Sequence, residues 1–208
     1  MQDKVSFRAH YERFPATVKG AFVLRAAARD PHQVKILSAR VTELAGRDAR
    51  SIDLEPVTLD VAPRLDLFVP FEFSVTDLAP GWYGLECEVT VDGVGALVHP
   101  GKRFPVAWPR ATVRRGTIPV GKSVDAKGAK VRVEQVDCNG DSIKITYSAP
   151  EQVGLKLSAD DSTLTLIEED FDQESGQGRV SAYPLMKTQA KLSIEVRGAT
   201  VPLVIGLR

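Results

Sequence analysis

Apolar and polar residues alternate along most of this chain, and that period of two is typical of strands with one buried face. In the second half the pattern is clearest at 131–133, 143–147 and 192–196. In the first half it recurs at 57–61 and 85–91. These segments are short, and turn-forming residues separate them. The pattern therefore predicts a succession of β-strands and leaves little room for a long helix.

Two dipeptides predict tight hairpins between such strands. Asp92-Gly93 separates Val91 from Val94, and Asn139-Gly140 follows an alternating segment. Both pairs tolerate the positive φ that a two-residue type I′ turn requires at its two central positions. The chain also contains 13 prolines and 16 glycines, which interrupt the apolar segments frequently. Both observations favour an all-β fold.

One cluster carries a fold-level resemblance. Residues 78–85 read Leu-Ala-Pro-Gly-Trp-Tyr-Gly-Leu and lead into an alternating segment. The cluster resembles the tyrosine corner of immunoglobulin-like and fibronectin-III-like sandwiches. The resemblance implies that Tyr83 fills the edge of a core while its hydroxyl bonds a carbonyl of the preceding turn. Cys87 follows Tyr83 by four residues, whereas the antibody pattern has two.

The length of 208 residues suits two sandwiches of about 100 residues each. Pro109, Gly116 and Pro119 interrupt the pattern near the middle of the chain. We therefore expect an all-β protein of two tandem immunoglobulin/fibronectin-III-like β-sandwich domains. The first would span 1–110 and the second 123–208, with a linker at 111–122.

Composition narrows the class of protein. The hydrophobic fraction is 43% and the charged fraction 26%, which suits a globular protein with a core. Basic and acidic residues number 27 each, and this balance argues against a dedicated nucleic-acid or membrane-surface binder. The chain has no long apolar run and no leader-like start, so we expect no insertion in a membrane. Its two cysteines are far apart in the sequence and read as reduced and buried. We therefore expect a cytoplasmic protein. Nothing in the sequence implies a cofactor.

Residues Gly116 to Ser123 match the phosphate-binding pattern G-x-x-x-x-G-K-[ST] at every position. The resemblance to P-loop proteins would give Lys122 and Ser123 contacts with phosphate and magnesium. A P-loop leads into a helix, however, whereas the residues after Ser123 contain Gly128 and then a strand pattern. Pro119 also lacks an N–H. The alternative, an interdomain linker, fits this context better, and nucleotide binding is not expected.

The predicted junction is locally basic and contains a tryptophan. Such a cluster could bind a protein partner or an anion, and the alternative is a solvated hinge. Its members are Trp108, Arg110, Arg114, Arg115 and Lys122.

An acidic stretch gives the one candidate metal site. Asp170, Asp172 and Glu174 alternate, so an extended loop could direct three carboxylates at one calcium ion. The stretch lacks the spacing of an EF-hand, and the alternative is a solvated connection.

These observations favour a non-catalytic protein-binding or adaptor protein that engages a protein partner or assembles with itself. Sandwiches present loops at their ends and open strands at their edges, and both can recruit partners. A structural subunit of a larger homo- or hetero-oligomeric assembly is the alternative. The third hypothesis is a nucleotide-binding enzyme that uses Gly116 to Ser123.

Overall fold

The computed structural model describes residues 4–27, 30–108, 115–160, 162–185 and 191–207. Regular structure in these residues consists of strands without helices, so the predicted all-β class is confirmed. The described residues include no helical segment with the length and hydrophobicity needed to cross a membrane. Contacts divide the chain into an N-terminal unit, Met1–Val106, and a C-terminal unit, Ala107–Arg208. Each unit has its own hydrophobic core.

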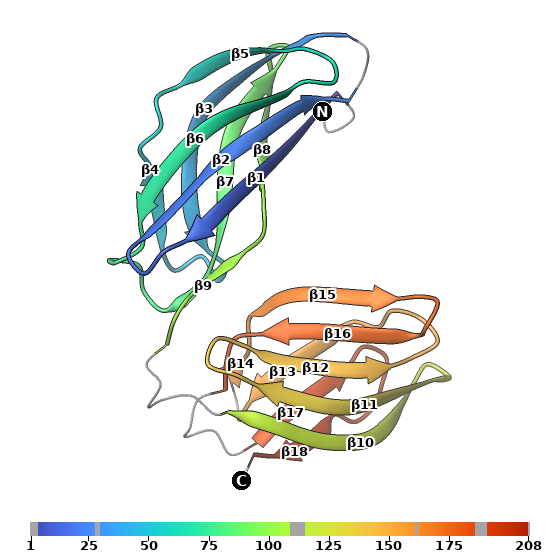
Figure 1. The fold of residues 1–208 in the computed structure, drawn as a ribbon. Coiled ribbons are helices and arrows are strands. Elements are labelled where there is room, and N and C mark those ends of the chain that lie inside the picture. The colour runs from blue at the N-terminus through green and yellow to red at the C-terminus, as the bar shows by residue number, and fades with distance from the viewer. Residues whose placement is uncertain (1–3, 28–29, 109–114, 161, 186–190, 208) are drawn as a thin grey trace. The chain divides into compact units, whose positions relative to one another are not determined.

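The N-terminal unit is a sandwich of two antiparallel sheets. One sheet has the order β1-β2-β6, and in the other β7 pairs β3, with β4 and β5 along β3 and with β8 and β9 along β7. Figure 1 shows β1, β2 and β6 as one layer and β3 and β7 as the layer behind it. The strands are β1 (Val5–Arg13), β2 (Thr17–Ala26), β3 (His32–Glu43), β4 (Ala49–Ile52), β5 (Val57–Val61), β6 (Asp66–Ser74), β7 (Gly81–Val91), β8 (Val94–Val98) and β9 (Phe104–Val106).

Alternation places one face of each strand in this core. Along β7 every second residue from Gly81 to Val91 is buried. Aromatic rings form the centre of the core: Phe22 lies 4.5 Å from Phe71, and Phe104 lies 6.0 Å from Tyr83. Aromatic rings bury large areas, so this cluster is a major source of the unit's stability.

The tyrosine corner is present where the sequence places it. Tyr83 is fully buried at the start of β7, and its hydroxyl donates a hydrogen bond to the carbonyl oxygen of Ala79 at 2.9 Å. The bond ties the strand to the turn that precedes it.

The first of the two predicted hairpin turns is confirmed and the second is wrong. Asp92 and Gly93 have φ of 51° and 82° and join β7 to β8. Asn139 instead begins a longer loop, because the flanking pair is Cys138 with Ile143. The Asn139 side chain accepts hydrogen bonds from the amides of Asp141 and Ser142, which stabilises this loop without a type I′ turn.

The C-terminal unit is also a two-sheet antiparallel sandwich. Its sheets have the orders β10-β11-β12-β16-β15 and β14-β13-β17-β18, and its core is mainly aliphatic. The strands are β10 (Gly116–Ala126), β11 (Ala129–Cys138), β12 (Ile143–Ser148), β13 (Leu155–Ala159), β14 (Ser162–Thr163), β15 (Leu166–Asp172), β16 (Gln177–Ala182), β17 (Lys191–Val196) and β18 (Leu203–Gly206).

Residues 116–122, assigned to a linker by the sequence, instead form the first part of β10 and pair with β11. The strand tolerates Pro119 because it lies at a sheet edge, where a missing N–H does not interrupt a ladder. One extra residue between Pro119 and Lys122 forms a β-bulge, and Gly121 supplies the φ of 60° there. A two-residue turn at Lys127-Gly128, with φ of 50° and 86°, then leads into β11.

Candidate functional site

Most edge strands of the two sandwiches carry features that discourage pairing with another chain. Proline removes a donor from β6 at Pro70 and from β10 at Pro119. The edge strand β15 carries Glu168, Glu169 and Asp170, and charge at an edge opposes strand addition.

The edge strand β8 has none of these features. Its sequence Val-Gly-Ala-Leu-Val contains no charge and no proline, and it lies at the end of its sheet. Val94 is 64% exposed and Leu97 52% exposed. An uncharged edge with exposed apolar side chains is a template for an incoming strand.

The strand β18 is also uncharged, but it is partly covered. It contacts β10, and Ala199 in the preceding loop forms a bridge with Ala126 of β10. Of the remaining edges, β1, β4 and β5 carry Arg8, Arg50 and Asp60, β9 contains Pro105, and β14 is only two residues long. Within the described strands, β8 therefore presents the most accessible edge for pairing.

The register of β8 with β7 determines which backbone N–H and C=O groups of β8 are free. Because Asp92-Gly93 is a two-residue loop, the flanking pair Val91 and Val94 exchanges hydrogen bonds. Bonded and non-bonded pairs alternate in an antiparallel ladder, so Gly95 and Leu97 direct their N–H and C=O groups away from β7. These two residues offer the hydrogen-bonding groups that an added strand would use.

A hollow of about 430 Å³ adjoins this edge on the outer face of the sheet. It extends over β3, β7 and β8, and the space above Gly95 is open, since a Cβ built there meets nothing within 4 Å. The lining residues are Leu37, Ser38, Arg40, Glu86, Glu88, Val89, Gly95, Ala96 and Leu97.

A β-bulge in β3 shapes one wall of the hollow. The register with β7 shifts between Ile36, which is fully buried, and Ser38. Leu37 is the extra residue and is 37% exposed. The bulge thus places Leu37 at the hollow, facing the same space as Leu97, and apolar walls result on two sides.

The charges of the hollow are two carboxylates and one guanidinium. Arg40 Nε lies 2.6 Å from Glu86 Oε2, and His99 Nδ1 lies 3.9 Å from the other oxygen of Glu86. Glu88 accepts a hydrogen bond of 3.3 Å from the Ser38 hydroxyl. Glu88 is therefore the carboxylate that is bound by a neutral donor rather than by a cation.

Beneath this face, Cys87 is a buried free thiol. Burial, together with the smaller effect of the neighbouring Glu86 charge, raises the pKa of Cys87 to about 12. The thiol is protonated at neutral pH and acts as a small apolar core residue. The second cysteine, Cys138, is likewise buried, as the sequence predicts.

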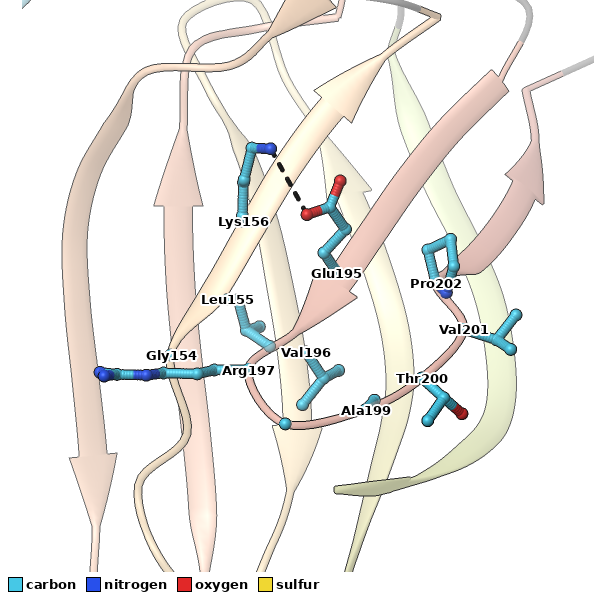
Figure 2. Close-up of a pocket in the computed structure, with 11 residues that line it drawn as sticks. Gly154, Leu155, Lys156, Glu195, Val196, Arg197, Ala199, Thr200, Val201 and Pro202 are labelled. Carbon is cyan, nitrogen blue, oxygen red and sulfur yellow. Dashed lines mark hydrogen bonds and ion pairs between the residues drawn. The ribbon is translucent and has the colours of Figure 1, made fainter. Parts of the chain in front are cut away.

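A second hollow, of about 590 Å³, lies in the C-terminal unit beside the 197–202 loop. Figure 2 shows Lys156 of β13 directed toward Glu195 of β17, with Val201 and Pro202 on the loop. The Lys156 ammonium and the Glu195 carboxylate are 3.4 Å apart and neutralise each other. Arg197 is the third charged residue of the lining, which therefore carries one more cation than carboxylate. The edge strand β18, which follows this loop, is partly covered by β10.

The residues of the predicted basic junction have separate surroundings. Trp108 packs edge-on against Tyr183 at 5.4 Å, and a Cβ on Gly140 would lie 2.6 Å from the Arg115 guanidinium. Lys122 is exposed on β10. Arg110 and Arg114 lie outside the described residues, and binding at the junction stays a prediction.

The residues of the P-loop pattern form a strand and not a loop before a helix. Lys122 pairs with Val133 and Ser123 with Arg132 in the ladder of β10 with β11. Successive N–H groups of an extended strand point to opposite sides, so they cannot surround a phosphate. The nucleotide-binding hypothesis loses its structural basis.

The predicted calcium site is also not formed. No group of three metal-ligating side chains is close enough to hold a metal in the described part of the chain. Asp172 instead accepts hydrogen bonds from the Glu174 amide and the Ser175 hydroxyl, which stabilises the turn between β15 and β16. The hydrogen bond from the Ser175 hydroxyl, and to a smaller extent the bond from the Glu174 amide, lower the pKa of Asp172. Asp170 faces Arg179 across the ladder.

Comparisons with known proteins leave the family open. No family model matches the chain, and no curated protein matches it. A crystal structure of a conserved domain protein from Bacillus anthracis is 10% identical, with a TM-score of 0.39 over 100% of this chain and 89% of that chain. The C-terminal domain of the Streptococcus agalactiae AgI/II polypeptide BspA is also 10% identical, with a TM-score of 0.20 over 97% and 99%. Neither similarity bears on the function of this chain.

Sequence reasoning missed the β8 site, although part of its signal is visible. The segment 94–98 is an uncharged strand after a hairpin turn, and the alternation of β3 is interrupted at Leu37. Nothing in the sequence says that β8 lies at an edge or that Leu37 and Leu97 share one hollow.

Proposed function

We propose that this protein is a non-catalytic binding protein whose N-terminal sandwich captures an extended segment of a protein partner by strand addition to β8. The observation that carries the proposal is the uncharged edge at Val94–Val98, with Gly95 and Leu97 offering free backbone groups. Main-chain hydrogen bonds supply affinity in this mode of recognition, and a neighbouring pocket for alternate side chains supplies specificity. The hollow beside Gly95 would be that pocket.

Immunoglobulin- or fibronectin-III-like character of the N-terminal unit belongs to the same proposal. Its support is the tyrosine corner at Tyr83 and the strand order, with β1, β2 and β6 in one sheet and β3, β7 and β8 in the other. Two such modules in one chain suit an adaptor, in which each module can hold a different partner.

A labelled, blocked peptide of alternating valine and threonine is a suitable probe, because it has high strand propensity and no charge. We expect its addition to the full chain to shift the amide resonances of Gly95 and Leu97 and to slow their hydrogen exchange. Leu97→Lys should weaken this binding, since a lysine at an edge opposes strand addition. Phe68→Lys is the matched control, because Phe68 is 65% exposed on β6, in the other sheet.

Two results would overturn the proposal. One is an absence of any peptide effect on Gly95 and Leu97. The other is that, without peptide, the protection of those two amides from hydrogen exchange increases with protein concentration. The second result would mean that another copy of the chain occupies β8, and it would favour the structural-subunit alternative.

A further inference from the structure

We infer that the segment recognised at β8 carries a lysine or arginine on the side of the strand that faces the hollow. This inference rests on the proposed strand addition and specifies the chemistry of the partner. The hollow combines two apolar walls, Leu37 and Leu97, with the carboxylate of Glu88. A lysine or arginine needs that combination, because its aliphatic stem packs on apolar surface while its charged end seeks a carboxylate.

Strand geometry allows a long side chain of the added strand to reach Glu88. A strand added to β8 would lie roughly 5 Å beyond it, and thus roughly 10 Å from β7. Glu88 of β7 faces outward opposite Leu97, and Thr90 faces outward opposite Gly95. Because Gly95 has no side chain and the space above it is open, a long side chain from the added strand can cross β8 toward Glu88.

The charge distribution favours a cation in that position. Glu86 is already bound by Arg40 at 2.6 Å, whereas Glu88 accepts only a neutral hydrogen bond from Ser38 among its described contacts. The lining side chains therefore carry one more carboxylate than guanidinium. Lys35 lies on β3 across Thr90, outside the lining, and no ion pair joins it to Glu88 in the described structure. A lysine or arginine of the partner would give Glu88 the ion pair that Glu86 already forms with Arg40.

Three versions of the valine–threonine probe test this inference on the full chain. One outward threonine is replaced by lysine, by acetyl-lysine or by glutamate. At low salt the lysine peptide should bind about two- to fivefold more tightly than the acetyl-lysine peptide, as expected for one solvent-exposed ion pair. The glutamate peptide should bind most weakly, and raising the salt concentration should reduce the differences.

Glu88→Gln should abolish the preference for lysine without abolishing binding of the uncharged probe. The matched control is Glu72→Gln, which makes the same change in net charge on β6, where Glu72 pairs with Lys19 at 3.0 Å. This control should keep the preference.

Equal binding of the three peptides by the wild type would overturn the inference and leave the proposed strand addition intact. A lysine preference that survives in Glu88→Gln would also overturn it. If even the uncharged probe fails to bind, the proposed function fails, and this inference fails with it.

Discussion

At the scale of single residues, the N-terminal unit contains a buried carboxylate with an unusual position. The Glu43 side chain is only 1% exposed, and it lies against Gly81, where a Cβ would come within 2.9 Å of it. Arg47 reaches its carboxylate at 2.7 Å and also donates a backbone hydrogen bond to it. The pair fixes the loop after β3 beside the tyrosine corner.

We predict that Arg47→Ala destabilises the N-terminal unit by about 1 to 3 kcal/mol, because a buried carboxylate loses a charged donor. Arg25→Ala is the matched control, since Arg25 and Asp66 form an ion pair in which both side chains are 41% or more exposed. Such a pair contributes at most about 1 kcal/mol. Urea denaturation of both variants measures the difference, and equal losses would contradict the prediction.

A second feature at this scale is the Asp92 carboxylate, which accepts several hydrogen bonds at the turn between β7 and β8. Its carboxylate lies 2.9 Å from His32 Nδ1 and 3.2 Å from the Lys4 ammonium, and it accepts from the Gln33 amide. The hydrogen bond with His32, followed by those with Lys4 and Gln33, lowers the pKa of Asp92. The folded state thus holds this carboxylate in its charged form more strongly than the unfolded state does.

We predict that this carboxylate makes stability depend on acid pH. An unfolded aspartate has a pKa of about 3.9, so the contribution is present above that pH and is lost as pH falls through the lower folded pKa. Asp92→Asn removes the charge and keeps a residue that tolerates positive φ. Unfolding midpoints below about pH 4 should therefore fall more steeply for wild type than for the variant. Parallel curves would show that the contacts of Asp92 do not contribute.

At the scale of elements, one aromatic ring lies over a glycine in the neighbouring strand. Tyr147 of β12 pairs with Gly178 of β16, and a Cβ on Gly178 would overlap the Tyr147 ring. The same ring stacks on Phe171 of β15 at 6.2 Å. The glycine is therefore required by packing between strands rather than by a turn.

We predict that Gly178→Ala destabilises the C-terminal unit by about 1 to 3 kcal/mol, because the added methyl group must displace a packed ring. Gly206→Ala is the matched control on β18, where a Cβ meets nothing within 4 Å. Thermal unfolding compares the two variants. A similar loss in both would mean that glycine flexibility, and not the Tyr147 ring, determines the effect.

At the scale of the whole molecule, the chain contains two cores whose members come from different halves. The N-terminal core extends from Val5 to Phe104, and the C-terminal core from Ala126 to Leu207. A unit with its own core and about 100 residues can fold by itself.

We therefore predict that residues 1–106 and 107–208, expressed separately, each unfold cooperatively. Their amide spectra should overlay the corresponding resonances of the full chain, apart from residues near the cut. A fragment that stays unfolded would show that its core depends on the other unit.

Local pattern determined much of this protein. Alternation predicted the all-β class and the positions of several strands, and the cluster around Tyr83 predicted a corner that is present. Local pattern failed at residues 116–122, because glycine and proline signal a linker whereas an edge strand with a bulge accepts both. It also failed at Asn139-Gly140, where the side chain of Asn139 stabilises a longer loop.

The site was decided by tertiary structure. A period of two says which face of a strand is buried, but it does not say which strand lies beside it or which strand has no neighbour. Only the sheet order makes β8 an edge, and only the register of β3, β7 and β8 brings Leu37, Glu88 and Leu97 to one hollow. The sequence by itself therefore determined that the chain forms sandwiches, whereas the pairing of distant strands determined which edge strand is open to the proposed partner.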